Sequence, residues 1–137
     1  MVLTHLVDTS AVTRAQRPQV ATRLGELLRA HRAGCTPLTA LEVGYSARSA
    51  TEFDALTGAL EVFDAVPITD GDYARAGAVQ RMLASRGQRG RKLPDLLIAA
   101  VAERSGLTVL HYDRAFALIA EVTGQSHEWV VPPGTVD

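Results

Sequence analysis

Residues 96–102 form an unbroken apolar run, LLIAAVA, and this run restricts the fold more than any other feature of the sequence. A helix that is apolar on every side must be buried on most of its surface. The run therefore predicts a central helix from about 94 to 105, which ends at Gly106. Asp95 stands at the head of this helix, where an acid suits the first turn. We expect Asp95 both to begin the helix and to present its carboxylate.

Short apolar stretches alternate with stretches of helical period along the whole chain. This alternation predicts an α/β protein with a mainly parallel central sheet, flanked by helices on both faces. We expect a single domain over residues 1–137, with a short tail at 132–137. The expected strands are 2–7, 35–38, 64–68, 107–112 and 127–131, and the other expected helices are 18–32, 39–49, 53–63, 73–87 and 113–124.

Several local signals set the expected boundaries. Gly34 is expected to end the helix 18–32. Thr39 is expected to cap the next helix, because Glu42 follows at the spacing of a capping box. Pro67 either weakens the strand 64–68 or places it at an edge of the sheet. The helix 18–32 has an apolar stripe that suits either the core or a groove for a partner segment, made of Leu24, Leu27 and Leu28.

Composition excludes several classes of protein. A net charge of −1 and a hydrophobic fraction of 47% are not those of a disordered chain. No apolar run reaches the ~18 residues of a membrane span, and the first residues lack the basic and apolar regions of a signal peptide. The single cysteine, Cys35, excludes an internal disulfide and fits a cytoplasmic protein.

Acidic residues are expected along one edge of the sheet. Asp8 and Asp113 each follow an expected strand, Glu42 lies in the first turn after the second strand, and Asp95 opens a helix. Carboxyl ends of parallel strands and amino ends of the returning helices share one edge. Whether the carboxylates also meet depends on the strand order, which the sequence leaves open. Oxygen ligands of this kind suit Mg²⁺ or Mn²⁺, which can activate water for attack on a phosphodiester.

Cationic residues close to these acids favour a phosphate substrate. The segment 86–92, RGQRGRK, carries four cations and no acid. Each cation taken singly is better explained by solubility, but cations around an acidic, metal-binding floor suit a polyanion such as RNA. The expected RNA-binding residues are Arg14, Arg91, Lys92 and Arg114.

Four motifs in order resemble those of the PIN-domain family, and specifically of its VapC-type toxins: LVDTSA, LTALEVGYSAR, KLPDLLIAAVAE and TVLHYDRAF. The resemblance extends from Val7 to about Ala120. It implies a Mg²⁺- or Mn²⁺-dependent endoribonuclease of a toxin–antitoxin pair, which cuts structured RNA such as tRNA or rRNA through a metal-activated water. It also implies a homodimer and a cognate antitoxin. The implied metal-binding and catalytic residues are Asp8, Glu42, Asp95 and Asp113, supported by the hydroxyls of Thr9 and Ser10.

One position departs from the family pattern. Many members have DRDF where this chain has DRAF, and Ala115 cannot bind a metal ion. This departure argues against a second metal site. It also keeps open an alternative function, a PIN-like module that binds RNA or a partner protein without cleaving RNA.

Overall fold

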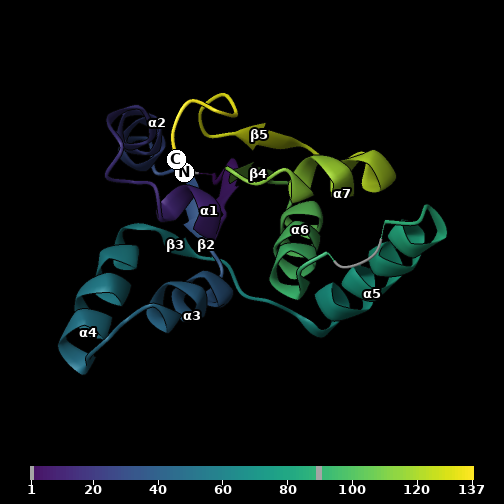
Figure 1. Cartoon of the computed structure of the whole chain (residues 1–137), viewed down its shortest axis with the longest axis horizontal. Helices are drawn as coiled ribbons and strands as arrows, with labels where there is room; N and C mark the ends of the chain where they lie inside the picture. Colours follow the sequence, from purple (N-terminus) through teal and green to yellow (C-terminus); the bar gives the residue numbers. More distant parts are fainter. Residues whose placement is uncertain (1, 89–90) are drawn as a thin grey trace.

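The computed structural model describes residues 2–88 and 91–137. Within these residues the strands are β1 (His5–Val7), β2 (Ala33–Cys35), β3 (Asp64–Ala65), β4 (Thr108–His111) and β5 (His127–Trp129). They form one sheet of order β3-β2-β1-β4-β5, and every described pair is parallel (Figure 1). The chain therefore has the predicted α/β fold. Strand order reverses beside β1, and ligands of open α/β sheets bind at such a point.

Helices cover both faces of the sheet, as predicted. The described helices are α1 (Thr9–Val12), α2 (Pro18–Arg29), α3 (Pro37–Tyr45), α4 (Ala50–Gly58), the 3₁₀ helix η1 (Ala59–Val62), α5 (Asp70–Ser85), α6 (Leu93–Ser105) and α7 (Ala115–Thr123). Helices α3 and α4 pack on each other and extend away from the sheet (Figure 1). No helix in the described ranges is long and apolar enough to cross a membrane.

Two apolar cores lie on opposite faces of the sheet. Leu6 of β1 and Val109 of β4 face the core that includes α5, α6 and α7. Their neighbours Val7 and Leu110 face the other core, which includes α1 and α2. Successive strand residues point to opposite faces, so each strand contributes to both cores.

Helix α6 is buried as the apolar run predicts. Ile98, Val101 and Ala102 are fully buried, and Gly106 ends the helix with a φ of 68°. The helix packs against α5, α7, β1 and β4. Its first turn is therefore held rigidly at the carboxyl edge of the sheet.

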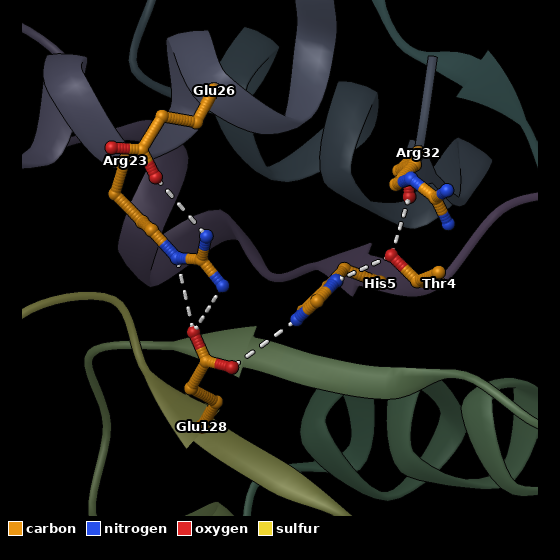
Figure 2. A network of polar contacts seen from close by, with 6 residues as sticks. All are labelled: Thr4, His5, Arg23, Glu26, Arg32 and Glu128. Carbon is orange, nitrogen blue, oxygen red and sulfur yellow. Dashed lines mark hydrogen bonds and ion pairs between the residues drawn. The ribbon is translucent and has the colours of Figure 1, made fainter. Parts of the chain in front are cut away.

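Helix α2 is attached to the sheet by a polar network (Figure 2). Arg23 donates from Nε and Nη2 to Glu128 Oε2 over 3.1 and 2.8 Å, while His5 Nε2 lies 3.2 Å from Glu128 Oε1. Burial disfavours the charge on Glu128, but the hydrogen bonds from Arg23 and His5 lower its pKa below the ordinary value. One carboxylate thus joins α2, β1 and β5.

The predicted start of α3 is wrong. The helix begins at Pro37, Thr36 is its N-cap residue, and Thr39 is fully buried within the first turn. Proline at the first helical position fixes the backbone there, so no Thr39–Glu42 capping box forms. Glu42 consequently lies in the second turn of α3, not in the first.

The predicted end of the preceding helix is also wrong. Helix α2 ends at Arg29, and His31, with a φ of 56°, makes the turn. Gly34 instead lies inside β2, which spans Ala33–Cys35, so the predicted strand 35–38 starts too late. The edge position of β3 is confirmed, and the buried Cys35 lies in the second strand as expected.

Gly34 occupies a position without room for a side chain. A Cβ there would lie 2.8 Å from Val66 Cγ2 and 3.1 Å from the Asp64 carbonyl oxygen. We expect Gly34→Ala to lower the free energy of unfolding by about 1–3 kcal/mol, measured by urea denaturation. Gly77→Ala in α5 is the control, since its Cβ would meet no described atom within 4 Å; it should raise stability by about 0.5–1 kcal/mol. Equal effects of the two substitutions would contradict the packing argument.

Candidate active site

Asp8 lies directly after β1 and is the N-cap residue of α1. Its Oδ2 accepts hydrogen bonds from the Ser10 N–H over 2.9 Å and from the Ser10 hydroxyl over 2.6 Å. Its Oδ1 is buried and has no hydrogen-bond partner in the described part of the chain. Ser10 therefore fixes one oxygen of this carboxylate and leaves the other available.

Asp113 follows the neighbouring strand β4 at the same edge. Its Oδ1 accepts a hydrogen bond from the Ala115 N–H over 2.9 Å, and its Oδ2 lies 3.9 Å from Lys92 Nζ. Ala115 itself is buried, 6% exposed, at the start of α7. Asp113 thus supports the first turn of α7 and faces the one lysine of the sequence.

Glu42 reaches the site from α3. Its Oε1 accepts a hydrogen bond from the Thr9 hydroxyl over 2.7 Å, and the same hydroxyl lies 3.3 Å from Thr39 Oγ1. Thr9 opens α1 next to Asp8. This hydroxyl joins the acid of α3 to the loop that carries Asp8.

Asp95 does not cap α6, which corrects the expectation that it begins the helix. Helix α6 begins at Leu93, Lys92 is the N-cap residue, and no side-chain cap hydrogen bond is found within the described residues. Asp95 is only 5% exposed, and its buried Oδ2 has no hydrogen-bond partner in residues 2–88 and 91–137. Its carboxylate is presented to the site and is not used by its own helix.

The acids are close enough to affect one another's ionisation. Burial raises the pKa of Asp8 against the opposing hydrogen bonds of Ser10, and the charges of Glu42 and Asp113 raise it further. Burial also raises the pKa of Asp95 to about 7, again assisted by Asp8 and Asp113, while Lys92 opposes the shift. The strand order brings together the carboxylates that the sequence separates.

The donor set fits a hard divalent cation. Two buried carboxylate oxygens, Asp8 Oδ1 and Asp95 Oδ2, have no partner among the described residues. Groups of this kind are stabilised when they bind a cation, and oxygen-only sites suit Mg²⁺ or Mn²⁺. No three described His, Cys, Asp or Glu side chains are already arranged as metal ligands. Neighbouring carboxylates that repel one another resist that closer arrangement.

The expected RNA-binding cations lie in different surroundings. Lys92 and Arg114 are exposed beside the acids, and Arg91 is half-buried. Arg14 is engaged within the protein, since it donates to the backbone oxygens of Ser10 and Asp137 over 2.7 Å each. Part of the expected basic segment 86–92, Arg89 and Gly90, lies outside the described residues.

His111 lies beside the site and is not among the predicted site residues. It is fully buried at the end of β4. Its Nδ1 accepts a hydrogen bond from the Asp113 N–H over 3.1 Å, so the ring proton is assigned to Nε2, 2.9 Å from His127 Nδ1. Burial, with a smaller contribution from His127, lowers the pKa of His111 to about 4. The neutral ring fixes the backbone of Asp113.

An apolar groove of about 590 Å³ lies next to the acids. Leu24 and Leu28 of α2 line it, and it extends to Glu42 of α3. Leu27 does not line the groove; like Leu24 it belongs to the buried core, which is the other possibility that the sequence left open for this stripe. The rest of the lining comes from α1, α3, α4, η1 and the segments beside them.

Comparison with known proteins decides the family. The model of the PIN domain matches residues 5–122. The chain belongs to the PIN-domain family. Ribonuclease VapC51 of Mycobacterium tuberculosis is 52% identical over 137 residues, which cover all of both chains. Ribonuclease VapC18 of the same organism is 44% identical over 95% of this chain and 97% of its own length. The resemblance of this PIN-domain protein to VapC-type members is thus confirmed.

Solved structures agree with this assignment. The VapBC complex of Salmonella typhimurium bound to DNA matches with a TM-score of 0.78, at 20% identity over 94% of this chain and 99% of that chain. VapBC-5 of Mycobacterium tuberculosis matches with a TM-score of 0.66, at 26% identity over 91% of this chain and 95% of that chain. The likeness at 20% identity shows a shared fold.

The raised pKa of Asp95 makes stability depend on pH. The folded protein retains this proton up to about pH 7, whereas the ordinary pKa of an aspartate carboxyl is 3.8. The contribution of the protonated Asp95 carboxyl to folding stability is therefore fully present below about pH 4. It is lost as the pH rises through about 7. We expect Asp95→Asn to reduce this loss and to raise stability at about pH 8 by about 1–3 kcal/mol.

Urea denaturation in EDTA at about pH 5 and about pH 8 measures this effect. Asp54→Asn is the matched control, because Asp54 is exposed on α4. An Asp95→Asn variant that loses as much stability with pH as the wild type would contradict the assignment of the buried charge.

Proposed function

We propose that this PIN-domain protein is a Mg²⁺- or Mn²⁺-dependent endoribonuclease, the toxin of a toxin–antitoxin pair, that cleaves structured RNA such as tRNA or rRNA. The observation that carries the proposal is the convergence of Asp8, Glu42, Asp95 and Asp113 at one edge of the sheet. Two of their buried oxygens are without partners among the described residues. The relatives VapC51 and VapC18 are ribonucleases by name, which supports the same activity.

Each acid has a role in this proposal. Asp8, Asp95 and Asp113 hold the cation, and Glu42 accepts a proton from the attacking water or orients it. A bound divalent cation would polarise the water and offset the charge that develops on the phosphate. Water oxygen forms a bond to phosphorus while the bond to the 3′ oxygen breaks, which leaves a 5′-phosphate and a 3′-hydroxyl. Thr9 holds the Glu42 carboxylate at the site through its 2.7 Å hydrogen bond.

Cations beside the acids would bind the neighbouring phosphates of the RNA. Lys92 Nζ lies 3.9 Å from Asp113 Oδ2. The exposed Arg114 directly follows Asp113 in the sequence. Arg91 precedes Lys92 in the same segment. The contacts of Arg14 within the protein favour a different role for that residue.

A binding module without cleavage is the second candidate, and Ala115 favours it. This buried alanine occupies the position where many family members have a further acid. The acids that converge beside it favour cleavage. Clustered buried charge lowers the stability of the fold, and a destabilising cluster of this kind is expected where function requires it.

The partner we propose is a cognate antitoxin whose apolar segment occupies the groove beside Glu42. The groove is lined by Leu24, Leu28 and Phe63 among others, and an amphipathic helix binds surfaces of this kind. VapBC-5 of Mycobacterium tuberculosis, a member of the VapBC family of toxin–antitoxin systems, supports such a partner. The homodimer stays a prediction, for which the 93% exposed Tyr45 and the 70% exposed Leu41 offer apolar surface on α3.

The acids can be tested directly by cleavage of total RNA. We expect the partner-free protein with Mg²⁺ or Mn²⁺ to give discrete fragments, and Asp8→Asn, Asp95→Asn and Glu42→Gln each to reduce cleavage by about 100-fold or more. EDTA should abolish it. Asp54→Asn, which neutralises an exposed acid of α4, should leave it intact. Intact RNA with folded protein that binds Mn²⁺ would instead favour the binding module.

The role of Lys92 can be tested by the salt dependence of RNA binding. In the Asp8→Asn background, where the RNA stays intact, Lys92→Gln should weaken binding. It should also reduce the slope of log affinity against log salt by about 0.7–0.9, the contribution of one phosphate contact. Arg32→Gln is the control, because the exposed Arg32 precedes β2 at the opposite edge of the sheet. An unchanged slope in the Lys92 variant would contradict a phosphate contact.

A further inference from the structure

The segment 134–137, which we call the strap, is tied to Tyr112 by three hydrogen bonds. The Tyr112 hydroxyl accepts from the N–H groups of Gly134 and Val136 over 2.9 and 3.2 Å, and it donates to the Val136 carbonyl over 2.7 Å. Tyr112 lies between β4 and Asp113. The segment predicted as a short tail therefore contacts the active-site loop.

Arg14 makes the second attachment. Its guanidinium lies 4.7 Å from the centre of the Tyr112 ring, and its Nε donates to the backbone oxygen of Asp137 over 2.7 Å. Its Nη1 donates to the Ser10 carbonyl, also over 2.7 Å. Arg14 thus joins the strap to the loop that carries Asp8. The exposed ion pair of Arg17 with Asp137 adds little to this attachment.

Both attachments meet at Ser10. The Tyr112 N–H donates to the Ser10 hydroxyl over 2.8 Å, and this hydroxyl in turn donates to Asp8 Oδ2 over 2.6 Å. Arg14 holds the backbone carbonyl of the same serine. The position and direction of the Ser10 hydroxyl are therefore set by Tyr112 and Arg14 together.

We propose that the strap is a positioning element, which holds Tyr112 and Arg14 so that Ser10 fixes Asp8 with its free oxygen toward the cation. The inference rests on the proposed function, because it assigns Asp8 to a cation. Partners that orient a ligating carboxylate affect metal binding strongly, and the loss of one such partner weakens affinity by about 10- to 100-fold. The strap lies two hydrogen bonds further from Asp8 than Ser10 does. We therefore expect its loss to weaken metal affinity by less than this.

The test measures Mn²⁺ binding to the full chain by calorimetry in the absence of RNA. Tyr112→Phe removes the bonds of the hydroxyl to the strap but keeps the aromatic ring and the backbone N–H to Ser10. Arg14→Gln removes the second attachment. We expect each variant to raise the Mn²⁺ dissociation constant by about 3- to 10-fold, with greater amide hydrogen exchange at 134–137. Tyr73→Phe, on the exposed surface of α5, is the matched control and should change neither.

A double-mutant cycle separates positioning from general destabilisation. The Ser10→Ala substitution removes the hydroxyl that links Tyr112 to Asp8. In that background Tyr112→Phe should therefore have no further effect on the Mn²⁺ dissociation constant. An equal effect in both backgrounds would show that Tyr112 acts by another route. If the Tyr112→Phe, Arg14→Gln double variant binds Mn²⁺ as tightly as the wild type, the positioning role of the strap is overturned and the proposed function is not affected. Failure of the wild type to bind Mn²⁺ would overturn the proposed function and the inference that rests on it.

Discussion

The parallel pairing of β1 with β4 is the interaction on which the site depends. His5, Leu6 and Val7 lie opposite Thr108, Val109 and Leu110, and the Asp8 N–H continues the ladder with a 2.9 Å bond to the Leu110 carbonyl. This register places Asp8 and Asp113 at the same edge of two adjacent strands. Because β2 lies on the other side of β1, α3 starts at that edge too and brings Glu42 to it. A shift by one residue would turn every strand side chain to the wrong core.

Carboxylates at this edge of the sheet are buried, and burial disfavours their ionised form. Helix α6 is buried by its apolar run, which carries Asp95 into an environment that disfavours a charge. Asp8 meets the same penalty, which the hydrogen bonds of Ser10 offset in part. Such a site lowers the stability of the bare protein, and under the function we propose it holds its groups ready for a cation. Lys92 supplies one compensating charge from outside the core.

Errors in the sequence-based boundaries have identifiable physical causes. The apolar run and the strand 107–112 were predicted well because burial itself produces their patterns. Thr39 matched a capping-box spacing, but Pro37 sets the start of α3 and turns Thr39 inward. Gly34 resembled a helix stop, yet it is required in β2 because Val66 and the Asp64 carbonyl leave no room for a Cβ. Local signals could not reveal which neighbours these residues meet.

The sequence by itself determined the α/β class, the central buried helix and the acids expected at the carboxyl edge, because periodicity and strand–helix alternation are local properties of the chain. Tertiary structure decided the strand order, which brings the acids into electrostatic contact. It also decided that Asp95 presents its carboxylate without capping α6, that Thr9 holds Glu42, and that the strap reaches Ser10 through Tyr112. The hydrogen bonds among these contacts join residues 24 to 102 positions apart, and no local pattern encodes such pairings.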